Sequence, residues 1–214
     1  MTVRKTGGTL SSSVAVTQNY SSYVLLAETK PVSGTTNSVS GMTNPVMING
    51  TSQLTFNNIP QTYRDLKIQF SYMSHNTQND SQYRITWWIN NNTTNNRYYS
   101  RGGTSATGTP GHNSDNTDRF YFFYNYNHLT RRNDYPGQGE IIIPDYSTTL
   151  STNFRGAYGT SWNMVGLSYP TQWGFNYYND NVVKLPVTRL DFSWESDVKF
   201  CEKSKISIYG IGAV

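Results

Sequence analysis

Residues 54–73 read LTFNNIPQTYRDLKIQFSYM, and the second half of this stretch decides the fold class. Apolar and polar side chains take turns there at every position: Leu66, Ile68, Phe70 and Tyr72 against Lys67, Gln69 and Ser71. A period of two is typical of a β-strand with one buried and one solvated face. Ile59-Pro60 removes a backbone donor and forces an extended conformation, so the strand begins after a turn or at a sheet edge.

The same alternation recurs along the chain, and no long helical period competes with it. It is clearest at 83–90, 190–195 and 205–211. We therefore predict an all-β fold of eight to ten strands in one antiparallel two-sheet sandwich, with a jelly roll as the favoured version. The strand residues expected in the core are Leu66, Ile68, Phe70, Ile85, Trp87, Ile206 and Ile208.

The domain organisation follows from where the alternation starts. Residues 1–22 are small and polar, which predicts an extended N-terminal arm or first edge strand, with a frayed terminus as the alternative. Residues 23–214 are expected to form a single β-sandwich domain. Two long polar stretches, 31–50 and 100–118, are predicted to be exposed loops. No apolar stretch approaches the roughly 20 residues that cross a bilayer, so no membrane contact is expected.

Composition narrows the classes of function. Only 14% of residues are charged, whereas the chain holds 17 Tyr and 5 Trp, which suits strands joined by polar loops. The net charge is +4, but Lys and Arg are scattered rather than clustered. No nucleic-acid partner is therefore predicted. The single cysteine, Cys201, lies in an apolar run and is expected to be a buried free thiol.

No motif indicates catalysis, a metal or a cofactor. His75, His112 and His128 lack metal-ligand spacing, and there is no nucleophile elbow or phosphate-binding loop. The carboxylates that a glycan-cleaving enzyme would need are Glu140, Asp145, Asp191, Glu195 and Asp197. Asp191 and Glu195 would lie about 13 Å apart on one strand face, which exceeds the working separation of either glycosidase mechanism. We expect these carboxylates to be solvated, and no catalytic, cofactor or metal residue is predicted.

Two further groups of residues have a functional alternative. Residues 113–118, NSDNTD, have oxygen donors spaced loosely like a calcium loop, but a turn built on Asx hydrogen bonds is favoured. Trp173, Tyr177 and Tyr178 form an aromatic group that could stack on glycan rings or fill a subunit interface. The interface is favoured, because Tyr and Trp are enriched at such contacts.

Five short segments carry a resemblance to a known group of proteins. Residues 56–66 read FNNIPQTYRDL, and Ile85–Asn90 reads ITWWIN before Tyr98-Tyr99-Ser100. Ile143-Pro144-Asp145-Tyr146 and the closing Ile208-Tyr209-Gly210-Ile211 follow in order. This series resembles the pattern F-x-x-I-P-x-T-Y-x-D-L, I-x-F-N, Y-S, I-P-x-Y and L-Y-G-I of tailed-bacteriophage virion structural proteins. The insertions at 100–138 depart from that pattern, so loop functions do not carry over.

The resemblance implies a β-sandwich component of the virion, made in the host cytoplasm. The leading hypothesis is a decoration or cement protein on the head exterior that packs against the major capsid protein or other virion proteins, as a homo-oligomer and by resemblance a trimer. The alternative is a tail-fibre or baseplate module that binds a host receptor or surface glycan. A glycan-cleaving enzyme acting through Glu140 or Asp145 is the third and least favoured hypothesis.

Overall fold

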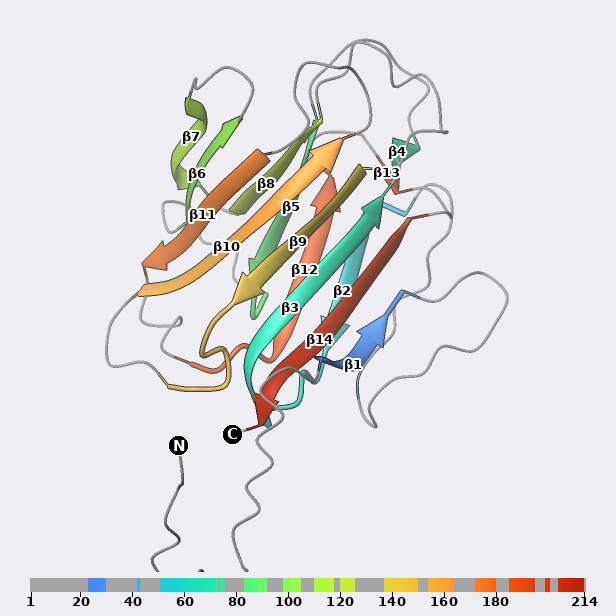
Figure 1. Cartoon of the computed structure of the whole chain (residues 1–214), viewed down its shortest axis with the longest axis vertical. Coiled ribbons are helices and arrows are strands. Elements are labelled where there is room, and N and C mark those ends of the chain that lie inside the picture. The colour runs from blue at the N-terminus through green and yellow to red at the C-terminus, as the bar shows by residue number, and fades with distance from the viewer. Residues whose placement is uncertain are drawn as a thin grey trace, which may run out of the picture.

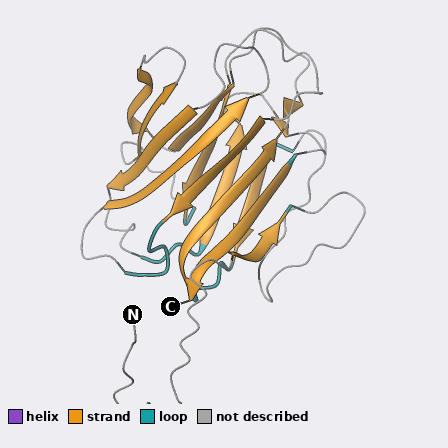
Figure 2. Ribbon diagram, in the orientation of Figure 1, coloured by secondary structure: helices purple, strands orange, loops and turns teal. Residues whose placement is uncertain are grey.

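A computed structural model describes the chain over residues 23–29, 42, 51–72, 74–75, 83–91, 98–104, 110–117, 120–125, 137–149, 154–163, 172–179, 185–194, 199–200 and 204–213. Over these residues the chain is all-β, with fourteen strands and no helix (Figure 2). The strands form two large antiparallel sheets and one small pair. The predicted all-β two-sheet architecture is confirmed, although the strands outnumber the eight to ten expected. The jelly-roll connectivity stays a prediction.

The larger sheet has eight strands and forms the front layer in Figure 1. Its order is β1 (Tyr23–Glu28), β14 (Lys205–Ala213), β3 (Tyr63–Tyr72), β9 (Gly137–Ile143), β10 (Phe154–Asn163), β11 (Gln172–Asn179), β6 (Tyr98–Thr104) and β7 (Pro110–Thr117). The stretch that decides the fold class thus becomes β3, a central strand between β14 and β9.

The second sheet has four strands and lies behind the first (Figure 1). Its order is β2 (Gln53–Asn57), β12 (Arg189–Trp194), β5 (Tyr83–Ile89) and β8 (Phe120–Asn125). The short strands β4 (Ser74–His75) and β13 (Lys199–Phe200) pair with each other beside the two main sheets.

The core lies between the two sheets. Phe70 of the eight-stranded sheet meets Phe192 of the four-stranded sheet edge to face, with 5.3 Å between the ring centroids. Ile68 pairs with Ile208 on one side and with Ile141 on the other, so one row of isoleucines faces inward. Burying one such side chain stabilises the fold by about 1.5–3 kcal/mol. The seven residues assigned to the core are all buried: Leu66, Ile68, Phe70, Ile85, Trp87, Ile206 and Ile208.

The prediction of a polar loop at 100–118 is wrong. β6 pairs with β11 over seven residues, and β7 pairs with β6 at a register that shifts twice. The residues are Gly-, Ser- and Asn-rich and have low intrinsic strand propensity. Their backbone groups nevertheless gain partners from a neighbouring strand, so pairing overrides propensity. His112 and most of the suggested calcium loop at 113–118 lie within β7.

The alternation in β5 is only half of the account. The alternation over 83–90 places Thr86 and Trp88 on the face opposite to Ile85 and Trp87 and predicts that they are solvated, yet all four side chains are buried. A strand buried on both faces cannot be told from a half-exposed one by its pattern alone when an outward residue is aromatic.

Several predictions fall on residues outside the described ranges. These are the N-terminal arm at 1–22, most of the 31–50 loop, Cys201, His128, Glu195 and Asp197. Within the part of the chain that the structure describes, no helix is long and apolar enough to cross a membrane. The described residues also hold no group of three or more His, Cys, Asp or Glu that could bind a metal ion.

Candidate interaction surface

The outward face of the eight-stranded sheet carries a row of aromatic and apolar side chains. Tyr209 of β14 pairs with Lys67 of β3, Lys67 with Ile142 of β9, and Ile142 with Tyr158 of β10. Directly paired residues share one face of a sheet, so these four lie in line on the side away from the core. Tyr158, in the fourth of these strands, is 45% exposed.

Tyr23 of β1 lies over the same face. The ammonium of Lys67 is 4.8 Å from the centroid of the Tyr23 ring. The rings of Tyr23 and Tyr209 pack edge to face, with 6.4 Å between their centroids and 83° between their planes. The Lys67 side chain is only 13% exposed, whereas Tyr23 is 54% exposed. One face of the Tyr23 ring thus covers the ammonium, and much of the remaining ring is open to water.

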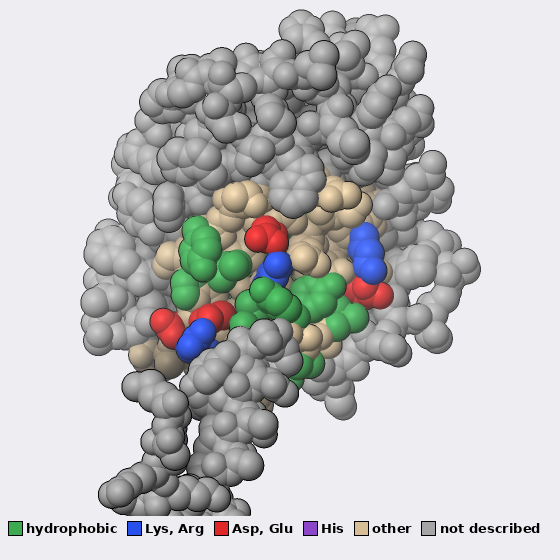
Figure 3. Space-filling view, in the orientation of Figure 1, with side chains coloured by type: hydrophobic (Ala, Val, Ile, Leu, Met, Phe, Trp, Pro, Cys, Tyr) green, Lys and Arg blue, Asp and Glu red, His purple; other side chains and the backbone are tan. Residues whose placement is uncertain are grey.

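Three ion pairs lie on this face. Lys67 Nζ lies 2.8 Å from Glu140 Oε2, and Lys205 Nζ lies 2.7 Å from Glu28 Oε2. Near the start of β3, a terminal guanidinium nitrogen of Arg64 lies 2.8 Å from Asp65 Oδ2. Figure 3 shows apolar groups beside these blue and red pairs on the side that faces the viewer. We call Tyr23, Tyr209, Lys67, Ile142 and Tyr158 the tyrosine face.

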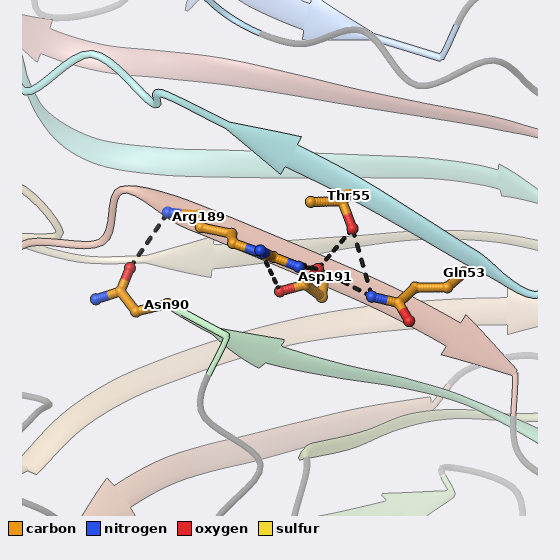
Figure 4. Close-up of polar contacts among 5 residues, drawn as sticks. All are labelled: Gln53, Thr55, Asn90, Arg189 and Asp191. Atoms are coloured by element: carbon orange, nitrogen blue, oxygen red, sulfur yellow. Dashed lines mark hydrogen bonds and ion pairs between the residues drawn. The ribbon is translucent and has the colours of Figure 1, made fainter.

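The outward face of the four-stranded sheet differs (Figure 4). Asp191 of β12 is 0% exposed, and its Oδ1 accepts hydrogen bonds from Thr55 Oγ1 at 2.6 Å and Gln53 Nε2 at 3.1 Å. Arg189 completes the Asp191 network: its Nε donates to Oδ2 at 2.8 Å and its second amino group donates to Oδ1 at 2.7 Å. Hydrogen bonding to Asp191 raises the pKa of Arg189, whose charge is therefore secure.

The expectation that Asp191 is solvated is wrong. Its two oxygens are committed to four side-chain donors within the sheet, so it has no open position for a substrate. Asn90 prolongs the polar network along the sheet: its Oδ1 accepts from the amides of Thr188 and Arg189 at 2.9 and 3.2 Å. Glu140, another candidate carboxylate, is held by Lys67 on the opposite side of the sandwich.

One end of the sandwich joins two of the segments that carry the resemblance. Ile143 ends β9 and the chain turns through Pro144 and Asp145 to Tyr146, which is fully buried. The Tyr146 hydroxyl donates to the carbonyl of Pro60, and its amide donates to the carbonyl of Arg64 at 3.0 Å. Burial raises the pKa of the Tyr146 hydroxyl to about 12. The two Ile-Pro segments are therefore tied directly together.

The turn is fixed by a second contact. Asp145 has a φ of 48°, a left-handed backbone conformation, and its amide donates to Asp65 Oδ1 at 3.0 Å. Burial alone would raise the pKa of Asp65, but the hydrogen bonds from Arg64 and from the Asp145 amide outweigh it, and the pKa is lowered. Asp65 is therefore ionised wherever the turn is formed near neutral pH.

The same end connects to the four-stranded sheet. Tyr146 O accepts from the amide of Val187 at 2.8 Å, and Ile59 donates its amide to Thr188 O at 3.1 Å. Gln61 Nε2 bridges the carbonyls of Ile59 and Val187 at 2.7 and 3.0 Å. Residues 185–188 lead into β12, so these bonds join the two layers of the sandwich.

The last segment of the resemblance meets the first at Gly210. A Cβ built on Gly210 would lie 2.4 Å from Cγ of Tyr63 and under 3.0 Å from two further ring carbons. Only glycine leaves room for that ring, which packs against the core. We call Pro60, Tyr63, Asp65, Tyr146 and Gly210 the closing end of the sandwich.

The aromatic residues singled out from the sequence lie in β11, next to β10. Trp173 pairs with Thr160, Tyr177 with Gly156 and Tyr178 with Arg155. Their side chains are outside what the structure describes, so their role as interface or glycan contacts stays a prediction. Sequence reasoning missed Tyr23 and Tyr158. The usable signal was Tyr158 opposite Ile142, but cross-strand register cannot be deduced from one strand.

Comparison of this chain with protein-family models, curated proteins and solved structures finds no match.

Proposed function

We propose that this chain is a non-enzymatic structural protein of a tailed-bacteriophage particle, and that it decorates and reinforces the exterior of the head. In this role it is made in the host cytoplasm and then packs against the major capsid protein or neighbouring virion proteins. A homo-oligomer, by resemblance a trimer, is part of the proposal. The type of particle is proposed from the sequence resemblance. The contacts of the closing end and the state of two carboxylates support the proposal.

The observation that carries the proposal is the closing end. The segments at 56–66, 143–146 and 208–211 lie far apart in the sequence, yet each contributes a contact there. Tyr146 bonds the carbonyl of Pro60, and Gly210 leaves space for the ring of Tyr63. Segments that contact one another for a shared packing reason support the resemblance better than five short matches taken singly.

The state of two candidate carboxylates supports a role without catalysis. Asp191 is saturated with hydrogen bonds, and Glu140 is ion-paired with Lys67. A general acid and a nucleophile both need a carboxylate oxygen that the substrate can reach. Asp191 is fully buried, and one oxygen of Glu140 is held by Lys67, so binding through surfaces is the better hypothesis.

The direct test is to locate the chain in purified particles. Mass spectrometry of gradient-purified virions should detect peptides of this chain in multiple copies per particle. Immunogold labelling should place it on the head exterior. Absence of the chain from purified particles would refute the proposal, and labelling confined to the tail would favour the fibre or baseplate alternative.

A deletion then tests the reinforcing role. Particles made without this chain should assemble but release their DNA at lower temperature or after milder osmotic shock than complete particles. Adding back purified protein should restore resistance. Adding back the less stable Asp191→Ala variant tests whether the restored resistance depends on the stability of the chain. Equal resistance of deleted and complete particles would rule out a cement function while leaving a virion role open.

A further inference from the structure

The tyrosine face presents two exposed rings, and one of them, Tyr23, is held in place by its neighbours. The Lys67 ammonium lies 4.8 Å from the centroid of the Tyr23 ring, and the Tyr209 ring packs edge to face with it, with 6.4 Å between the centroids. Tyr23 nevertheless keeps 54% of its surface open to water. Tyr158, 45% exposed, extends the same row from β10. A ring that is fixed before binding loses little conformational entropy when a ligand stacks on it.

The surface between the two rings is continuous sheet. Tyr23 in β1 and Tyr158 in β10 are four strand spacings apart, which is about 19 Å at about 4.8 Å per spacing. Lys67, Ile142 and Glu140 occupy the intervening strands β3 and β9. The arrangement suits an extended ligand that lies across the strands, with an apolar contact at each end and polar groups in the middle.

The charge pattern decides what kind of ligand fits. Among the described residues of this face, the cations of Lys67, Lys205 and Arg64 each lie within 2.8 Å of a carboxylate of the same face. An anionic partner would have to break these three pairs before it could use their cations. A neutral partner can instead use the carboxylate and ammonium groups as fixed hydrogen-bond acceptors and donors.

We infer that the tyrosine face binds a neutral polysaccharide, with Tyr23 and Tyr158 stacking against the apolar faces of its sugar rings. Sugar rings combine a flat C–H surface with hydroxyl groups at their rim, which matches tyrosine rings flanking paired charges. The inference concerns the isolated chain and does not depend on the proposed place in a virion. It also differs from the contact predicted for Trp173, Tyr177 and Tyr178, since its rings are in β1 and β10.

Biolayer interferometry with the full chain immobilised tests the inference. The probes are dextran, mannan, xyloglucan and mixed-linkage β-glucan, with dextran sulfate as the charged counterpart of dextran. At least one neutral polysaccharide should bind, and because no net charge is involved its binding should persist in high salt. The Tyr23→Ala/Tyr158→Ala double variant should bind about tenfold or more weakly, as expected when anchoring aromatic residues are removed.

Two controls separate stacking from other effects. Tyr158→Phe keeps the flat ring and should retain binding. Leu185→Ala removes a side chain of similar exposure, 53%, that lies outside the tyrosine face, and should also leave binding unchanged. Circular dichroism confirms that each variant is folded.

Three results would overturn the inference. The first is that the wild-type chain binds none of the four neutral polysaccharides. The second is that the double variant, still folded, binds as tightly as wild type. The third is that the two tyrosine substitutions abolish self-association in analytical ultracentrifugation without weakening polysaccharide binding, because the face would then be a contact between copies of the chain.

Discussion

Charged and aromatic side chains are buried on the outward face of one sheet and exposed on the outward face of the other. On the four-stranded sheet, Asp191 is 0% exposed and fully hydrogen-bonded, and Trp88 and Thr86 beside it are buried. On the eight-stranded sheet, Tyr23 and Tyr158 are exposed, and ion pairs such as Lys205–Glu28 stand in contact with water. Both faces come from strands with a period of two.

The difference shows that an outward position in a strand does not fix its environment. A paired charge contributes little where water competes for it, typically up to about 1 kcal/mol. Removing one partner of a buried pair lowers the free energy of unfolding by about 3–5 kcal/mol, because the other partner is left without a counter-charge. The outward face of the small sheet is therefore expected to hold the fold together, and that of the large sheet to be available for contacts.

Removing the buried carboxylate is the strongest way to break this comparison. Asp191→Ala leaves Arg189, Thr55 and Gln53 without their shared acceptor, and should lower the free energy of unfolding by about 3 kcal/mol or more. Urea denaturation followed by tryptophan fluorescence measures the loss. Asp191→Asn keeps the shape of the side chain but not its charge, so its free energy of unfolding should lie between those of Asp191→Ala and wild type. A loss below about 1 kcal/mol would mean that the network is as weak as a surface ion pair.

The closing end provides a contrast between two glycines of the eight-stranded sheet. Gly210→Ala places a methyl group against the ring of Tyr63 and should cost about 1–3 kcal/mol through overpacking. Gly156→Ala is the matched control, because a Cβ there meets nothing within 4 Å. Thermal denaturation of both variants gives the difference. If Gly156→Ala is the more damaging of the two, the packing argument for Gly210 fails.

Two tyrosines in opposite environments sharpen the comparison further. Tyr146→Phe removes the hydroxyl that donates to Pro60, so it should cost about 1–2 kcal/mol of unfolding free energy at neutral pH. Tyr158→Phe, which loses an exposed hydroxyl, should change stability by less than about 0.5 kcal/mol. Equal effects of the two substitutions in urea denaturation would contradict the assignment of Tyr146 as a structural tie.

The pH dependence of the Tyr146 contribution has a definite sign. Its pKa is raised from 10.0 to about 12 in the folded chain, so the folded state keeps the proton more tightly than the unfolded state. The stabilisation is complete below about pH 10 and is lost as pH rises toward about 12. The difference in unfolding free energy between wild type and Tyr146→Phe should therefore shrink over this window. A difference that grows there would reverse the sign and reject the assignment.

A small effect is expected at the Lys67–Glu140 ion pair, because Glu140 is 33% exposed and can be hydrated when Lys67 is replaced. Lys67→Met keeps the aliphatic stem over the sheet while removing the contacts to Glu140 and to the Tyr23 ring. It should cost about 1 kcal/mol or less, which is the counterpart of the large loss expected at Asp191. Salt titration of wild-type stability should show a correspondingly weak dependence. A loss similar to that of Asp191→Ala would remove the distinction between the two faces.

The sequence predicted much of the fold but little of the surface. Period-two runs identified β3, β12 and β14 with their inward residues, because burial of one face imposes that pattern directly. They could not identify β6 and β7, whose Gly- and Asn-rich residues become strands through pairing with a neighbour. The candidate surface could not be predicted either. Tyr23 and Tyr158 are 135 residues apart in the sequence and lie on one face only after five strands are aligned.

The amino-acid order by itself determined the class of this protein: alternating apolar residues cannot bury one side except as sheets packed in layers. Tertiary structure alone decided which charges are buried and which aromatic rings stay in water, because burial of an outward side chain depends on what covers its sheet. It also brought Pro60, Tyr146 and Gly210 into one closing end. Local patterns set the direction of a side chain, and long-range packing sets its environment.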